Sequence, residues 1–231
     1  AWMVWRALKR RGLSPLWILL YVWHPLPILE VAGQAHLELV PVALMLLAVD
    51  LALTKRRRLS ALVLGLAIAA KYLPVLIVPV LVWSARSWRA RVEQVALIAL
   101  PIAILLIPYL GAGAQLTDGL SAYGQAWRFN DGGFLLADWA LEGSGLSAAF
   151  CRSVVPAFVH VDPGFDPAEH STWMRIPPKL AVGALVVLVM GVLALRRGSL
   201  DAAGRVRASA FAAGALFVAF SPTVHPWYGL W

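Results

Sequence analysis

Long apolar runs separated by four short basic patches constrain this chain more than any other feature of its sequence. The runs recur along nearly its whole length, and about 20 residues of apolar helix suffice to cross a hydrocarbon core of roughly 30 Å. Hydrophobic residues make up 61% of the 231 residues and charged residues only 14%, a composition typical of membrane proteins. The sequence therefore predicts an all-α fold, a polytopic transmembrane helical bundle forming a single transmembrane domain over residues 1–231.

The four basic patches predict how this bundle crosses the membrane. They hold 15 of the 20 Lys and Arg residues, and the positive-inside rule places such patches on the cytoplasmic side. Because the net charge of +8 is gathered in these patches, it does not indicate nucleic-acid binding. The patches are Arg6, Lys9, Arg10 and Arg11, then Lys55 to Arg58, then Arg86, Arg89 and Arg91, and finally Arg196, Arg197, Arg205 and Arg207. The predicted crossings are residues 14–30, 37–54, 92–110, 178–195 and 208–222, with an extracytoplasmic loop over 112–177.

Residues 59–83 need another geometry, because a basic patch lies at each end of this apolar segment. A single crossing would leave one patch outside. Lys71 and Pro74 lie at its centre, and proline removes a backbone donor and disfavours helical geometry before it. We therefore predict a short-helix hairpin that turns at "KYLP", with Lys71 facing a protein-lined or water-filled cavity. The alternative is one tilted helix with a snorkelling lysine.

This topology gathers polar groups on the outer side. Nine of the twelve acidic residues lie there, and charges beside membrane spans by default indicate a functional site. The stretch "HPLPILEVAGQAHLE" (24–38) adds two histidines and two glutamates to apolar surroundings. Its prolines and glycine predict a broken helix near the interface, so that polar groups can face an extracytoplasmic cavity.

Four stretches, in order along the chain, resemble one family. They are "HPLPILEVAGQAHLE" (24–38), "LGLAIAAKYLPVLIVPVL" (64–81), "YGQAWRFNDGGF" (123–134) and "SPTVHPWY" (221–228). Together they resemble elements of the GT-C superfamily of polyprenyl-phosphate-sugar-dependent membrane glycosyltransferases, in particular family 87-like members and alpha-mannosyltransferases. Two departures stand out: His24 replaces the usual Asn, and Glu38 replaces the usual Asp.

The resemblance implies a GT-C-like fold and the transfer of a sugar, mannose above all, from a polyprenyl-phosphate donor to a glycolipid or glycan acceptor. It also implies an inverting reaction at the outer face of a bacterial cytoplasmic membrane. The sequence itself predicts no cofactor. A catalytic acidic residue of the family would precede Ala1. Because the chain starts at Ala1 rather than Met, we expect a fragment of a longer protein.

Such a transfer needs a group that accepts the proton of the acceptor hydroxyl, and cationic groups that stabilise the departing phosphate. The predicted proton acceptors are Glu30, His36 and Glu38. The predicted phosphate ligands are Lys71, Arg128 and His225, because ammonium and guanidinium groups pair with phosphate oxygens. The predicted contacts to sugar or acceptor are Trp127, Asn130, Asp131, Trp227 and Tyr228.

Simpler interpretations of these residues stay open. Glu30 could pair with a cation of another helix, and His36 and Glu38 could be hydrated interfacial residues. Arg128 could pair with Asp131, and His225 could be structural. No metal site is predicted, because the histidines and acidic residues between His160 and His170 lack a recognised ligand spacing.

Two other function classes compete with the transferase. A secondary transporter of a polar solute would also contain broken helices and intramembrane charges, but it predicts paired interrupted segments in two halves of the chain. The "KYLP" segment has no such counterpart near residues 178–226. A noncatalytic scaffold or flippase subunit would need neither an outer carboxylate nor a cation for phosphate.

Overall fold

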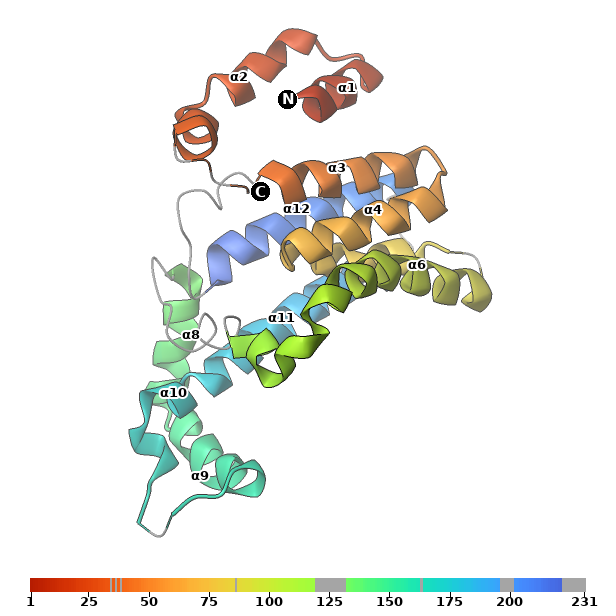
Figure 1. The fold of residues 1–231 in the computed structure, drawn as a ribbon. Helices are drawn as coiled ribbons and strands as arrows, with labels where there is room; N and C mark the ends of the chain where they lie inside the picture. Colours follow the sequence, from red (N-terminus) through yellow and green to blue (C-terminus); the bar gives the residue numbers. More distant parts are fainter. Residues whose placement is uncertain are drawn as a thin grey trace. The chain divides into compact units, whose positions relative to one another are not determined.

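The structure is a computed structural model that describes residues 1–33, 35, 37, 39–85, 87–118, 132–162, 164–195 and 202–221. Helices are the only regular secondary structure of these residues (Figure 1), and the chain is an all-α membrane protein, as predicted. Contacts divide it into two compact units. Unit 1 contains the described residues of 1–111 and 190–214, and unit 2 contains those of 112–189 and 215–221.

Unit 1 is built mainly from helices of the first half of the chain. In order they are α1 (Trp2–Arg10), the 3-10 helix η1 (Pro15–Ile18), α2 (Leu19–Val22), the π-helix η2 (Pro27–Gly33), α3 (Leu39–Leu53), α4 (Arg57–Ala70), the 3-10 helix η3 (Leu73–Ile77), α5 (Val78–Trp83), α6 (Trp88–Leu106) and the start of the 3-10 helix η4 (Ile107–Thr117). The C-terminal end of α11 (Ile176–Leu195) and the first part of α12 (Ala202–Phe220) complete unit 1.

The core of unit 1 forms where α4 packs between α3 and α6 (Figure 1). The buried hydroxyl of Ser60 on α4 donates a hydrogen bond of 2.7 Å to the carbonyl of Ala48 on α3. On its other side, Gly65 lets α4 approach α6 closely. A Cβ atom at Gly65 would collide with the carbonyl oxygen of Ile98 and lie 2.5 Å from Cγ of Pro101. Small residues at such contacts are typical of helix packing in membranes, where dispersion contacts rather than the hydrophobic effect hold helices together.

The segment after α4 reverses direction, as predicted for residues 59–83. α4 ends at Ala70, and the next residue, Lys71, is extended with φ −161° and ψ 135°. The short helices η3 and α5 then lead back, since Ser60 at the start of α4 and Ser84 after α5 line the same pocket of about 360 Å³. On one continuous helix these two serines would be roughly 36 Å apart. The hairpin is therefore confirmed, and the single tilted helix is wrong.

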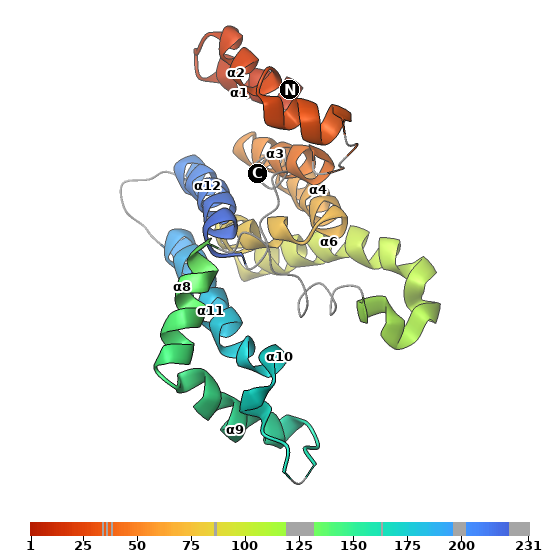
Figure 2. The same cartoon turned by 90° about the vertical axis from the view of Figure 1, so that its left-hand side faces the viewer.

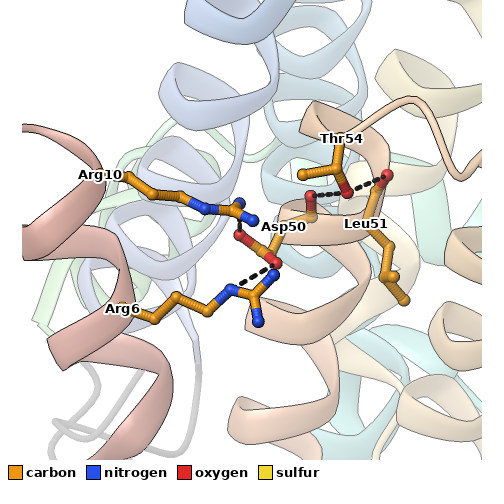
Figure 3. A network of polar contacts seen from close by, with 5 residues as sticks. All are labelled: Arg6, Arg10, Asp50, Leu51 and Thr54. Carbon is orange, nitrogen blue, oxygen red and sulfur yellow. Dashed lines mark hydrogen bonds and ion pairs between the residues drawn. The ribbon is translucent and has the colours of Figure 1, made fainter.

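The described residues of the first three basic patches meet at one end of unit 1. Arg6 and Arg10 of α1 both pair with Asp50, near the end of α3 (Figure 3), with 3.4 Å from Nε of Arg6 to the carboxylate. The second and third patches are joined by Arg58 at the start of α4, whose Nε lies 2.7 Å from Oε1 of Glu93 on α6. The loops that carry these patches therefore lie together.

The described residues of the fourth basic patch, Arg205 and Arg207, lie at the same end. Arg205 of α12 and Arg91 of α6 line one pocket of about 130 Å³. Arg207 of α12 and Arg11, which follows α1, line another. The described residues of all four patches therefore gather at one end of unit 1, which agrees with the topology predicted from their sequence positions. We name this end the basic end.

Two described helices are long and apolar enough to cross a membrane, Trp88–Gly113 and Ile176–Leu195. They coincide with two of the predicted crossings. A third is present if Pro15–Val22 and Pro27–Gly33, which are bent by 63° relative to each other, form one broken span. α3 covers the predicted crossing at 37–54 but has only 15 residues.

Unit 2 contains most of the predicted extracytoplasmic loop, and its described part is largely helical. The helices are α8 (Gly132–Gly143), α9 (Leu146–Phe158), the 3-10 helix η5 (Pro167–Glu169), α10 (Ser171–Met174), most of α11 and the last turns of α12. α8 packs against α9, and η5 and α10 fold back onto α9 (Figure 2). Gly133 lets α8 approach α12, because a Cβ atom there would lie 2.6 Å from the carbonyl oxygen of Ala219.

Candidate functional site

Lys71 is held where α4 ends. Its backbone N–H donates to the carbonyl of Ala67 at 3.0 Å, which closes the last turn of the helix. The chain then restarts as η3, in which Pro74 occupies the first turn and is fully buried. Proline is suited to a first turn because the N–H that it lacks would have no helical partner there. The break therefore fixes the backbone of Lys71 at a helix C-terminus, whose partial negative charge favours a cation.

A pocket of about 620 Å³ surrounds the half-buried Lys71. Its walls come from the last turn of α4 and from the start of α3, where Val40 and Pro41 contribute. Leu37, which precedes α3, and Tyr72, which is 45% exposed, complete the lining. Lys71 carries the one charged side chain among the residues that line this pocket. We name it the Lys71 pocket.

The Lys71 pocket lies one helix length from the basic end. α4 has 14 residues, which at 1.5 Å per residue span about 21 Å between Arg57 and Lys71. α3 runs the opposite way, since its start lines the Lys71 pocket and its end carries Asp50. Lys71 is thus a cation set apart from the four basic patches.

The helix before α3 is broken, as its prolines predicted. The chain bends by 63° between Pro15–Val22 and Pro27–Gly33. Within the bend, the Nδ1 atom of His24 accepts a hydrogen bond of 3.2 Å from the backbone N–H of Leu26. Glu30 lies on the π-helical η2. At this position the structure describes the backbone. π-helical turns are frequent at functional sites because they aim side chains away from the regular helical stripe.

The other predicted site residues lie outside the described residues, and their roles stay predictions. They are His36, Glu38, Trp127, Arg128, Asn130, Asp131, His225, Trp227 and Tyr228. The chain positions next to His36 and Glu38 are informative, because Leu37 lines the Lys71 pocket. Of the "GQAHLE" stretch, Leu37 is the residue that the structure places in the wall of this pocket.

Unit 2 contains an ion pair that no motif indicated. Nε and Nη2 of Arg152 on α9 donate to the carboxylate of Asp166 at 3.0 and 2.7 Å. Asp166 also accepts the N–H of Ala168 at 2.9 Å and so caps η5. The hydrogen bonds from Arg152 and then from Ala168 lower the pKa of Asp166 below its usual value. This pair fastens the segment after α9 back onto that helix.

The thiol of Cys151 is buried beside this ion pair. Burial first, and the negative charge of Asp166 second, raise the pKa of Cys151 above its usual value. The thiolate is the nucleophilic form of cysteine. Cys151 therefore stays a neutral packing residue.

An attraction between two opposite charges in unit 2 was not predicted from the sequence either. Asp138 on α8 is 9% exposed, and its carboxylate attracts the ammonium of Lys179 on α11. A charge this far from water needs such an opposite charge or hydrogen bonds. The two residues are 41 positions apart, so no local sequence pattern could have linked them.

Comparison with sequence models of protein families matches residues 1–222 to the model of glycosyltransferase family 87. No curated protein and no solved structure matches the chain at a significant level. The match covers the Lys71 pocket, the four basic patches and the described helices of both units, and it confirms the resemblance to family 87. The chain is an all-α membrane protein, and it belongs to glycosyltransferase family 87.

Proposed function

We propose that this glycosyltransferase takes mannose from a polyprenyl-phosphate donor and transfers it to a glycolipid or glycan. The observation that carries the proposal is the Lys71 pocket, in which one ammonium group meets walls that are otherwise mainly apolar. A polyprenyl phosphate has the matching chemistry, because its isoprenoid chain suits apolar walls and its phosphate suits a cation. Mannose as the sugar rests on the resemblance of the four motifs to alpha-mannosyltransferases.

In the proposed reaction the acceptor hydroxyl attacks the anomeric carbon while the bond from that carbon to the phosphate oxygen breaks. The configuration inverts, the polyprenyl phosphate leaves, and a carboxylate takes the hydroxyl proton. Glu38 is the proposed proton acceptor, since it follows Leu37 of the pocket wall. His36 and Glu30 would assist it.

Lys71 would stabilise the negative charge that develops on the departing phosphate. Arg128 and His225 are proposed to add donors to the same phosphate. The proposed contacts to sugar or acceptor are Trp127, Asn130, Asp131, Trp227 and Tyr228.

The proposed membrane is the bacterial cytoplasmic membrane. With the basic end on the cytoplasmic side, as the positive-inside rule favours, the Lys71 pocket opens toward the extracytoplasmic side. The segment 112–177 would then also be extracytoplasmic, inside a single transmembrane domain.

The test is transfer of radiolabelled mannose from polyprenyl-phosphate-mannose by membranes that contain the full-length protein. Lys71→Met keeps the length of the side chain but removes its charge, and we expect kcat/KM to fall by about 100-fold, as for loss of one charge-stabilising donor. Lys9→Met is the matched control, because it removes a lysine from the basic end. It should transfer at the wild-type rate.

The donor panel also contains polyprenyl-phosphate-glucose and polyprenyl-phosphate-arabinose. Transfer of glucose or arabinose alone would overturn the assignment of mannose and keep the donor class. No transfer from any of the three donors would overturn the donor class. In Glu38→Gln, wild-type kcat would contradict its role as proton acceptor.

A further inference from the structure

A second large pocket lies at the basic end of unit 1. It has a volume of about 790 Å³ and is enclosed by α1, α3 and α12. Apolar side chains such as Val4 and Leu8 of α1 and Leu46 of α3 form much of its wall. Arg10, Arg11 and Arg207 also line it. We name it the α1 pocket.

The α1 pocket is lined by more positive than negative side chains. Its one carboxylate, Asp50, is already shared by Arg6 and Arg10 (Figure 3). Arg11 and Arg207 are exposed, and neither has a carboxylate partner among the described residues. The pocket therefore offers two guanidinium groups beside an apolar wall.

α1 has the features of a helix that lies at a membrane interface. Trp2 is 57% exposed and Trp5 is 36% exposed. The guanidinium carbon of Arg6 lies 5.2 Å from the ring centre of Trp2, and Nζ of Lys9 lies 4.6 Å from that of Trp5. Tryptophan and basic residues together are typical of the headgroup region of a bilayer. The α1 pocket should therefore lie at the depth of lipid head groups.

We propose that the α1 pocket binds an anionic phospholipid, with its phosphate between Arg11 and Arg207 and part of an acyl chain along Val4, Leu8 and Leu46. Guanidinium groups match phosphate oxygens, and basic pockets between membrane helices bind anionic head groups. The apolar wall favours a lipid over free phosphate, which has nothing to place there. This site lies at the end of α3 and α4 remote from the Lys71 pocket, and the proposal does not depend on the donor or acceptor of the transfer reaction.

The test measures how much lipid the full-length protein retains, by native mass spectrometry after reconstitution with equal amounts of phosphatidylglycerol and phosphatidylcholine of the same acyl chains. We expect the wild type to retain phosphatidylglycerol preferentially. In Arg11→Gln/Arg207→Gln, loss of two basic groups should weaken phosphatidylglycerol binding about 30-fold. The matched control Arg56→Gln/Arg89→Gln removes two exposed arginines of the basic end that do not line this pocket, and it should retain the lipid.

A further variant tests the apolar wall. Ala210 lines the α1 pocket one turn after Arg207, so Ala210→Leu fills space for the acyl chain while both guanidinium groups stay. It should also lose phosphatidylglycerol. Equal retention of both lipids by the wild type, or equal loss in the two arginine double variants, would overturn the proposal. Displacement of the lipid by millimolar inorganic phosphate alone would overturn it too, because the site would then recognise phosphate without a chain.

Discussion

The two ends of the α3–α4 pair use charge in different ways. At the basic end, Asp50 holds two arginines of α1, and Arg58 of α4 holds Glu93 of α6. At the other end, one lysine at a helix break lines a pocket whose walls are mainly apolar. The difference teaches that the number of charges does not locate a site in this protein. The interruption of the helix locates the site, because it brings a cation to the pocket without a cluster of counter-charges on the same helix.

The largest effect on stability is expected from a substitution of Gly65, which lies on α4 between the two ends. Gly65→Leu would push α4 away from the backbone of Ile98 on α6 and should destabilise the fold by about 3 kcal/mol, as overpacking does. Both ends should fail together, with lower thermal stability, less transfer and less lipid retention. Gly183→Leu on α11 is the control, since no atom lies within 4 Å of a Cβ there. Wild-type stability of Gly65→Leu would show that α4 and α6 are not in this close contact.

A smaller effect should separate the two ends. Asp50 is 13% exposed and its two arginines 38%, so Asp50→Asn leaves partly buried cations without their carboxylate and should cost about 2 kcal/mol. We expect a lower thermal unfolding temperature but unchanged transfer per folded molecule, the opposite of Lys71→Met. If Asp50→Asn abolished transfer without lowering stability, the assignment of stability to the basic end and of transfer to the Lys71 end would be wrong.

The smallest effect is expected at neither end. The pKa of Asp166 is lowered in the folded protein by Arg152 and Ala168, so the pair stabilises the fold above the unfolded-state pKa of about 3.9. This contribution is lost as the pH falls through the lower folded-state pKa. Asp166→Asn should thus unfold at a slightly lower temperature than the wild type at pH 7.

The gap in unfolding temperature should close on acidification. Asp162→Asn serves as the comparison, because the Asp162 side chain is 89% exposed, and it should show no gap at either pH. A gap for Asp166→Asn that stays constant between pH 7 and pH 3 would contradict the role of the ion pair.

Local rules were enough to predict much of unit 1. The spacing of basic patches predicted that they share one end, and Pro74 between two such patches predicted the reversal at Lys71. The prolines after His24 predicted the broken helix. Each of these features depends on a few neighbouring residues, and for this reason each could be predicted from the sequence alone.

Long-range contacts could not be predicted in the same way. Asp50 pairs with Arg10 across 40 positions, and Asp138 attracts Lys179 across a similar distance along the chain. The close approach at Gly65 depends on which face of α6 meets α4, and no periodicity of a single helix contains that information. Of the predicted site residues, Lys71 alone is described with its side chain, so the catalytic assignments of Glu38 and its neighbours stay predictions.

The reversal between α4 and α5 changes how many times the chain is counted as crossing the membrane. Because residues 57–84 return to the side from which they came, they contribute an even number of passages through the bilayer. A hydropathy plot that scores the 59–83 segment as one crossing would therefore reverse the predicted direction of every later crossing. A reporter enzyme fused after Trp83 and one fused after Arg57 should therefore give the same signal.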